Sequence, residues 1–290
     1  MKRALALFLA GIALLAAACG SGPKATGHRK VVAAFYPLAW AAGQVAPGAL
    51  VEDLTPPGGE PHDLQLNAKQ RIDVQGADVV LILGKGFQPA LERASKDAKG
   101  TVVDLLRGLP LLPSTEQGIQ ADPHVWLDPK LMRSVVAQIA NALAAADATN
   151  AASYRSRAAS LESTLDGIDS QYRTGLASCD LKTIVTTHEA FGYLAREYGL
   201  VQLGLTGLTP EAEPSAAAIQ RVRSAVAHGR VGSIFYEATD EGRRIGRNVA
   251  HDVGVPPLPL STLESDPAPH DYLYEMRTNL VELKKGLRCH

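Results

Sequence analysis

The stretch Asp122-Pro123-His124-Val125-Trp126-Leu127-Asp128-Pro129 decides the fold, because it precedes a region that divides the chain into two parts of similar pattern. From Pro129 to Leu176 the sequence is almost without strand-forming residues and is dense in Ala, Leu, Gln, Arg and Ser. On either side of this region, short β-branched runs alternate with longer helical stretches, which is typical of βα units around parallel sheets. The sequence therefore predicts an α/β protein with two similar lobes, in which helices flank parallel sheets and one long helix joins the lobes.

Each lobe is predicted to contain four strands. The expected strands are Val31–Tyr36, Ala49–Leu54, Val79–Leu83, Thr101–Asp104, Thr183–Thr187, Val201–Leu203, Gly232–Tyr236 and Pro257–Leu260. The helices expected between and after them are Pro37–Val45, Ala68–Gln75, Gln88–Ala98, Ala190–Tyr198, Pro214–His228, Asp240–Val253 and His270–Lys285. These assignments rest on β-branched runs for the strands and on helix signals such as a proline in the first turn.

The joining region is predicted to contain the long helix, over Ala151–Leu176. Its apolar residues recur at steps of three and four, which indicates one amphipathic face: Tyr154, Ala158, Leu161, Leu165 and Ile168. Another packed helix is the plainer interpretation, but its place between two α/β lobes suggests a connecting strut. We therefore expect an N-terminal lobe over residues 31–128, linking helices over 129–178 and a C-terminal lobe over 179–290.

The first residues have the pattern of an export signal. Lys2 and Arg3 precede an apolar stretch that is short for a membrane span, and small residues lead to Cys19. The run Leu15-Ala16-Ala17-Ala18-Cys19-Gly20 resembles a bacterial lipobox, although its leucine lies four places before the cysteine rather than three. We expect a signal peptide over 1–18, lipidation at Cys19 and a flexible tether over 19–30, with a simply cleaved signal as the alternative.

Charge and cysteine content restrict the partners and the compartment. Without Lys2 and Arg3, 27 basic and 30 acidic residues remain and no basic cluster is present, so no nucleic-acid partner is predicted. Cys179 and Cys289 form an even pair in a chain that carries an export signal. A disulfide between them is favoured over free thiols, because exported proteins fold in an oxidising compartment.

Three histidines stand in similar settings. His62, His124 and His188 each follow a predicted strand or a proline-bounded loop, where parallel sheets build ligand sites. Proline directly before His62 and His124 restricts the backbone there. The three are separated by 62 and 64 residues, which matches no local zinc motif, so only tertiary folding brings them together. Taken singly, each is more often a structural or surface histidine than a ligand.

Four motifs, in the right order, resemble the metal-specific solute-binding proteins of ABC importers, the zinc and manganese class. They are Gly59-Glu60-Pro61-His62-Asp63, Asp122 to Pro129, Thr187-His188-Glu189-Ala190-Phe191-Gly192-Tyr193-Leu194 and Thr209-Pro210-Glu211-Ala212-Glu213-Pro214-Ser215. The resemblance covers almost the whole mature chain. It implies two α/β lobes joined by a long helix, with a metal ion buried in the cleft and bound by His62, His124 and His188.

The resemblance also indicates the metal. Manganese members usually carry a carboxylate where His188 stands, and imidazole nitrogens suit Zn²⁺ better than Mn²⁺, so Zn²⁺ is expected and Mn²⁺ is the alternative. Many relatives place an aspartate where Ser261 stands here. Glu264 and Asp266 are the candidates for the fourth ligand, with a water molecule or a solvated loop as alternatives.

Acidic residues beside the histidines are candidates to orient the imidazole rings through hydrogen bonds. They are Glu60, Asp63, Asp122 and Glu189. Residues 109–121 lack the histidine-rich loop that is common in zinc-binding relatives. A metal donor, such as a metallochaperone, would therefore be a separate protein.

The resemblance implies an extracytoplasmic, membrane-anchored monomer that delivers Zn²⁺ to an ABC permease and is not an enzyme. Two other functions remain open at this point. A zinc hydrolase would need an open metal position and a general base, for which Glu189 is the obvious candidate. An adhesin would use the same fold to bind another molecule.

Overall fold

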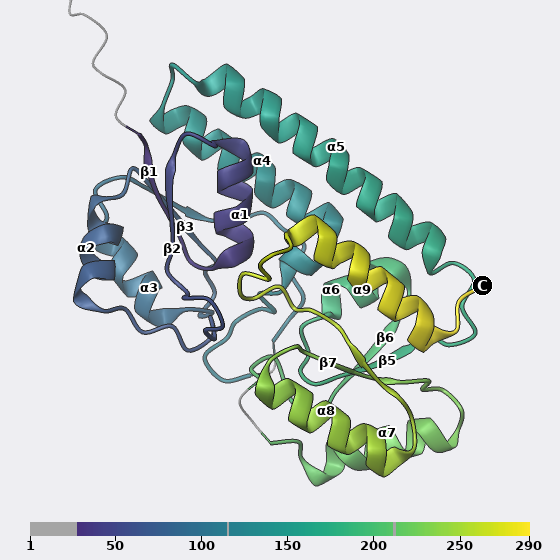
Figure 1. Cartoon of the computed structure of the whole chain (residues 1–290). Helices are drawn as coiled ribbons and strands as arrows, with labels where there is room; N and C mark the ends of the chain where they lie inside the picture. The colour runs from purple at the N-terminus through teal and green to yellow at the C-terminus, as the bar shows by residue number, and fades with distance from the viewer. Residues whose placement is uncertain (1–27, 115, 211–212) are drawn as a thin grey trace, which may run out of the picture.

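The computed structural model describes residues 28–114, 116–210 and 213–290, and it contains two four-stranded parallel sheets (Figure 1). The strand orders are β2-β1-β3-β4 and β6-β5-β7-β8, so the two sheets share one topology. All pairings in both sheets are parallel. The fold class predicted from the sequence is confirmed. Cys19 and the expected signal peptide lie outside the described residues.

The first sheet consists of β1 (Lys30–Ala33), β2 (Leu50–Asp53), β3 (Val79–Ile82) and β4 (Thr101–Asp104). The two central strands are almost completely buried, because helices cover both faces of a parallel sheet. The predicted strand Val31–Tyr36 is too long. Phe35 is the N-cap of the following helix and Pro37 lies in its first turn, so the chain has already left the sheet.

Three short helices belong to the first lobe: α1 (Tyr36–Val45), α2 (Ala68–Gly76) and α3 (Pro89–Ala94). Asn67 and Gln70 form a capping box that starts α2. The prediction of a single helix over Gln88–Ala98 is wrong at the C-terminal end. The α-helix stops at Ala94 and tightens into the 3₁₀ turn η1 (Ser95–Asp97), where the Ser95 hydroxyl donates to Glu92 O.

Two antiparallel helices, α4 (Pro129–Ala146) and α5 (Ala151–Gly175), form the joining region, and Figure 1 shows them packed side by side. Asp128 caps α4 by accepting a hydrogen bond from Lys130 N. The five apolar residues that predicted the buried face of α5 are all buried, and Tyr172 extends that face. The long connecting helix is thus confirmed, and it ends close to the start of the second sheet.

The second sheet consists of β5 (Thr183–Thr186), β6 (Val201–Gly204), β7 (Ile234–Tyr236) and β8 (Pro257–Pro259). Its helices are α6 (Gly192–Tyr198), α7 (Ala216–Ala227), α8 (Asp240–Val253) and α9 (Tyr272–Leu287). Neighbouring strand residues point to opposite faces. Ile184 and Phe235 therefore pack in the main core, while Val185 and Ile234 pack in a smaller core against α7 and α8.

The last helix, α9, ties the second sheet to the rest of the molecule. The Tyr172 hydroxyl on α5 donates to Met276 O at 2.7 Å, and Trp40 on α1 stacks on Tyr272 with the ring centroids 4.6 Å apart. The predicted Cys179–Cys289 disulfide is present and closes the end of α9 onto the segment before β5. As a result, one continuous apolar core runs through the first lobe, the joining helices and one face of the second sheet.

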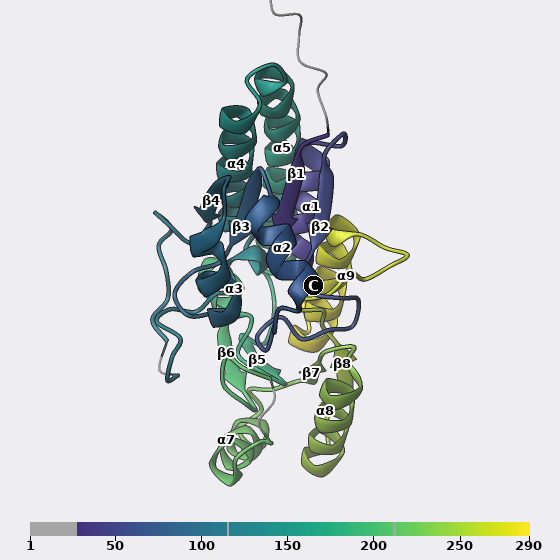
Figure 2. The same ribbon diagram turned by 90° about the vertical axis from the view of Figure 1, so that its left-hand side faces the viewer.

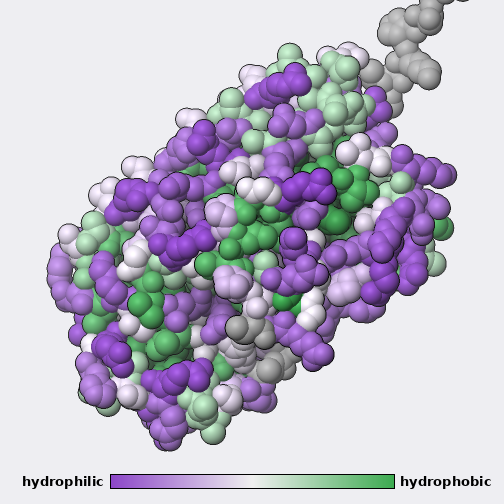
Figure 3. Space-filling model, turned by 180° about the vertical axis from the view of Figure 1, so that it is seen from behind, coloured by the Kyte–Doolittle hydropathy of each residue, from purple (hydrophilic) through white to green (hydrophobic). Residues whose placement is uncertain are grey.

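The surface of the molecule carries both hydrophobic and hydrophilic residues. In the view from behind, hydrophobic residues form small areas framed by hydrophilic ones (Figure 3). None of the helices in the described part of the chain is long and apolar enough to span a bilayer. In the side view of Figure 2, α4 and α5 stand at one end of the molecule and α7 and α8 at the other.

Candidate metal centre

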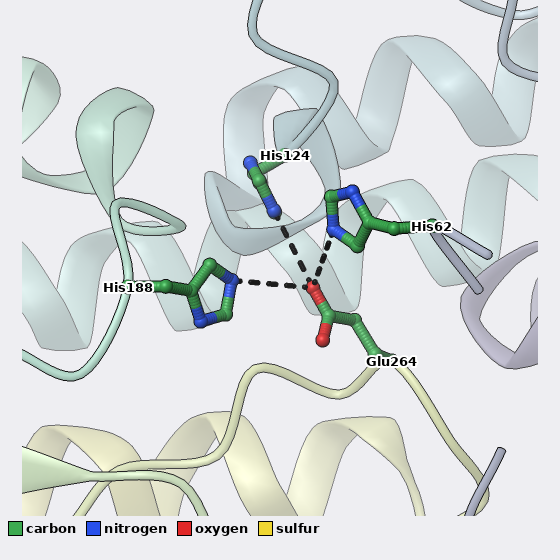
Figure 4. A group of neighbouring side chains, drawn as sticks. All are labelled: His62, His124, His188 and Glu264. Atoms are coloured by element: carbon green, nitrogen blue, oxygen red, sulfur yellow. Dashed lines mark ion pairs between the residues drawn. The ribbon is translucent and has the colours of Figure 1, made fainter. Parts of the chain in front are cut away.

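Four buried side chains from four separate segments meet between the two sheets (Figure 4). His62 lies in the loop between β2 and α2, and His124 is the N-cap of the 3₁₀ turn η2 (Val125–Leu127). His188 follows β5, and Glu264 lies in the segment between β8 and α9. The three histidines that the sequence singled out are therefore brought together, and Glu264 joins them.

The position of His188 follows from the sheet topology. β5 is a central strand, with β6 on one side and β7 on the other, so the chain leaves β5 at a topological switch point. Ligand sites in open parallel sheets form outside the carboxyl ends of the strands at such a point. Thr186 pairs with Phe235, and His188 and Glu237 each lie two residues further on. The two side chains therefore come from the same edge of the sheet.

The four ligand atoms are close enough to share one ion. Glu264 Oε1 lies 3.4 Å from His62 Nε2, 3.4 Å from His124 Nε2 and 3.5 Å from His188 Nε2. All four atoms lie within 4.8 Å of one another. The four residues are between 0 and 8% exposed, so water has little access to them.

The same four atoms are unsatisfied in the described structure. Nε2 of each histidine and Oε1 of Glu264 are buried and have no hydrogen-bond partner. Leaving a buried polar atom unpaired costs about 1–3 kcal/mol, so folded proteins seldom gather four of them in one place without a ligand. Three imidazole nitrogens and one carboxylate oxygen fit a tetrahedral Zn²⁺.

Two of the histidines are oriented by carboxylates on their other ring nitrogen. His124 Nδ1 is 2.8 Å from Asp122 Oδ1, and His188 Nδ1 contacts Glu237 Oε1. Thr187 Oγ1 donates to the same Glu237 oxygen at 2.9 Å. A proton held on Nδ1 in this way leaves Nε2 with its lone pair free for a metal. These contacts thus fix the tautomer as well as the ring direction.

His62 is held differently. Neither of its ring nitrogens has a hydrogen-bond partner among the described residues. Its ring packs edge-on against Phe87, with the centroids 4.7 Å apart. The peptide group that joins Pro61 to His62 is held at both of its polar atoms, since Glu60 Oε1 accepts from His62 N at 3.0 Å and Gln88 Nε2 donates to Pro61 O at 3.0 Å. Packing and backbone contacts therefore position this ring.

The electrostatics of the group follow from burial and from the facing charges. Burial lowers the pKa of His62. Burial acts in the same direction on His188, but the carboxylates of Glu237 and Glu264 outweigh it and raise the pKa of His188 well above its usual value. For His124, the facing carboxylates of Asp122 and Glu264 likewise outweigh burial and raise its pKa.

The pKa values of Glu264 and Glu60 shift in opposite directions. Burial acts to raise the pKa of Glu264, but the charge of His188 and the close approach of the facing imidazoles hold it well below the usual value. Burial and the charge of Glu264 raise the pKa of Glu60 to about 8. The facing charges therefore favour an anionic Glu264 and a protonated His188.

The segment that carries Glu264 is held by several contacts. Asn279 on α9 accepts from Ser261 N at 2.8 Å and donates to Ser261 O at 2.7 Å. Trp126 Nε1 donates to Thr262 O at 2.7 Å. Leu263 has φ of 59°, in the left-handed region that non-glycine residues seldom adopt. These contacts impose a turn that directs Glu264 toward the histidines.

Several residues that the sequence suggested lie elsewhere. Asp266 is exposed and accepts from Ala268 N, so it is not in the group, and Ser261 is occupied with Asn279. Asp63 is exposed on the loop after His62. Glu189 is also exposed, and it is not part of the group of four side chains. Of the four candidate orienting acids, Asp122 contacts a histidine ring and Glu60 contacts the His62 backbone.

Glu237, Asn279 and Trp126 are site residues that the sequence reasoning missed. Glu237 stands directly after the predicted strand Gly232–Tyr236. An acidic residue at the carboxyl end of a parallel strand is a candidate site residue, so the sequence did contain a signal for Glu237. Asn279 lies within a predicted helix and gave no local signal. Its role depends on which segment packs beside α9.

A family model described as the periplasmic component A of zinc-uptake complexes, ZnuA, matches residues 31–286. The zinc-binding lipoprotein AdcA of Streptococcus pneumoniae is 30% identical over 98% of this chain, and the chain spans 61% of the length of AdcA. The high-affinity zinc uptake system protein ZnuA of Bacillus subtilis is 29% identical, and the alignment covers 96% of each protein.

Solved structures show the same fold. The Zn(II)-bound ZnuA-like domain of Streptococcus pneumoniae AdcA matches with a TM-score of 0.78 and 31% identity, over 90% of this chain and 99% of that domain. The laminin-binding protein Lmb of Streptococcus agalactiae, described as bifunctional with adhesin and metal transporting activity, matches with a TM-score of 0.82 and 27% identity, over 90% of this chain and all of that protein. The chain therefore belongs to the ZnuA family, the periplasmic component A of zinc-uptake complexes.

Proposed function

We propose that this protein captures a Zn²⁺ ion outside the cytoplasm, through His62, His124, His188 and Glu264, and delivers it to an ABC permease. One observation carries the proposal: four buried ligand atoms without hydrogen-bond partners converge within 4.8 Å of one another. The relatives support it, because AdcA is named as a zinc-binding lipoprotein and the Bacillus subtilis ZnuA as a zinc uptake protein.

The ligand set favours zinc over manganese. Imidazole nitrogens suit Zn²⁺, whereas Mn²⁺ prefers carboxylates, carbonyls and water. Three of the four proposed ligands are imidazoles, and the Asp122 and Glu237 contacts increase the basicity of two of them. In this proposal Zn²⁺ is the transported cargo rather than a resident cofactor.

A site with four protein ligands also favours transport over hydrolysis as the function. Catalytic zinc sites keep a position open for water, whereas structural sites fill all four positions with protein ligands. Here four protein atoms are available, and Glu189, the candidate general base, is exposed and does not belong to the group. The named relatives are zinc-binding and zinc-uptake proteins, which agrees with a function other than catalysis.

The proposal extends to the organisation of the chain. We assign residues 31–128 and 179–290 to the two lobes and 129–178 to the linking helices. We also assign the protein to the extracytoplasmic face of the membrane, as a monomer anchored through a lipidated Cys19. The family description as periplasmic and the name of AdcA as a lipoprotein support this location. A separate metal donor remains part of the proposal.

The test is a zinc titration of the metal-free mature protein by competition with a chelator of known affinity. We expect one zinc per chain, and at least a 100-fold weaker affinity for His188→Ala and for Glu264→Ala, because each change removes one of four ligands. Glu189→Gln is the matched control and should bind like the wild type. Unchanged affinity in both ligand variants would refute the assignment.

A further inference from the structure

A cavity of about 680 Å³ lies beside the metal centre, and both lobes contribute to its wall. The first lobe supplies residues 58–60, and the second lobe supplies residues 237–242 and 261–267. Glu60, Glu237 and Glu264 belong both to this wall and to the surroundings of the three histidines. The cavity therefore leads to the buried centre.

The lining of the cavity is strongly acidic. Its acidic side chains are Glu60, Glu237, Asp240, Glu241, Glu264 and Asp266, and the described residues that line it include no lysine, arginine or histidine. Asp240 and Asp266 are exposed, and neither forms an ion pair in the described part of the chain, whereas Glu241 is paired with Arg244. Asp240 and Asp266 are thus the two outer carboxylates whose charge is not compensated by a neighbour.

A buried carboxylate oxygen that has no hydrogen-bond partner in the described structure lies at the inner end of the acidic cavity. Glu264 is 6% exposed and lines the cavity, and its Oε1 has no hydrogen-bond partner among the described residues. The Nε2 atoms of the three histidines lie 3.4–3.5 Å beyond that oxygen. The charge of the cavity and the unsatisfied atoms at its inner end both fit a cation.

We propose that this cavity is an acidic vestibule, through which a hydrated divalent cation reaches the four-ligand centre, and that Asp240 and Asp266 accelerate its capture. The inference rests on the function proposed above. A cleft lined by charge of one sign, with low-dielectric walls, concentrates counter-ions and raises association rates. The volume also suffices for an ion with its first water shell, since one water takes up about 30 Å³.

The experiment removes the two outer charges and leaves the ligands in place. Asp240→Asn with Asp266→Asn keeps the side-chain shape and the acceptor that Asp266 offers to Ala268 N. Asp97→Asn with Asp252→Asn is the matched control, because it changes the net charge equally at exposed sites on both lobes that do not line the cavity. Stopped-flow mixing with zinc, followed by tryptophan fluorescence, reports capture, since the Trp126 ring lies 5.0 Å from that of His124.

The association rate of the vestibule variant should fall about 10-fold at low ionic strength and about 2-fold at 0.15 M salt. These figures follow from two unit charges acting on a divalent ion at roughly 10 Å in water, with and without screening. The control variant should associate at the wild-type rate under both conditions. The dissociation rate, measured with excess chelator, should change much less than the association rate.

Two results would overturn the vestibule: equal association rates for wild type and vestibule variant at low salt, or equal slowing in the control variant. Either result, obtained with one zinc still bound per chain, leaves the proposed zinc-binding function standing. A wild-type protein that binds no zinc would overturn both proposals.

Discussion

Replacing Glu237 by Gln isolates the contribution of one charge to metal binding. The glutamine keeps the length of the side chain and an oxygen that accepts from His188 Nδ1 and Thr187 Oγ1, so the contact geometry is conserved and only the negative charge is lost. Loss of a partner that orients a ligating histidine typically weakens metal affinity 10- to 100-fold. That range corresponds to about 1.4–2.7 kcal/mol of binding free energy.

The effect should depend on pH, and its sign follows from the pKa of His188. Glu237 and Glu264 raise that pKa well above its usual value, so at neutral pH zinc must displace a proton from His188. Wild-type affinity should therefore fall as the pH is lowered through the raised pKa. Without the charge of Glu237 the pKa drops, proton competition starts at lower pH, and the penalty of the variant becomes smaller in acid.

Competition titrations of wild type and Glu237→Gln at pH 8, 7 and 6 measure this difference. The affinity ratio should be largest at pH 8 and should shrink toward pH 6. Glu189→Gln is the control, because Glu189 adjoins His188 in sequence but is exposed. Equal affinities at pH 8, or a ratio that grows toward acid, would refute the assignment of Glu237 as the partner of His188.

Three further changes test the surroundings of the centre. Asn279→Ala removes two hydrogen bonds to Ser261, so the free energy of unfolding in urea should fall by about 1–3 kcal/mol and zinc affinity should fall with it; an unchanged affinity would show that Glu264 is positioned without Asn279. Cys179→Ser with Cys289→Ser opens a loop of 110 residues, for which chain entropy gives a loss of at most about 4–5 kcal/mol on urea unfolding; zinc affinity should persist, and a loss of binding in the folded variant would contradict this. Saturating zinc at 100 times its dissociation constant should stabilise the native state by about 2.7 kcal/mol, and calorimetric melting that is independent of zinc would count against native-state binding.

Most of the fold was predictable from the sequence because its elements have strong local patterns. The β4 and α8 bounds agree with the predicted ranges, and the buried face of α5 matches the apolar spacing that predicted it. The errors lie at the ends of helices and strands, where a capping residue or a proline determines the residue at which the element begins or ends. The chain leaves β1 early because Phe35 already caps α1, and α3 ends early because the backbone tightens at Ser95.

The site was predictable only in part, because two of its features depend on tertiary structure. The histidine settings could be recognised from strand ends and prolines, and each candidate then needed the fold to bring it into place. Glu237 became a partner of His188 through pairing of β5 with β7, which are not consecutive in the chain. The direction of Glu264 depends on the left-handed backbone at Leu263 and on contacts from Trp126 and Asn279, none of which has a signature in the local sequence.

The unbroken apolar packing from α1 through α5 to α9 limits how far the lobes can move in the proposed delivery of the ion. Swinging the halves apart would uncover that packing, and exposing 400 Å² of it would cost about 10 kcal/mol. In the proposed delivery step, a shift of the short segments that carry the four proposed ligands would therefore cost less than separation of the lobes. Under that proposal, release of the ion is a local rearrangement around the four side chains, and the two sheets and the joining helices keep their arrangement.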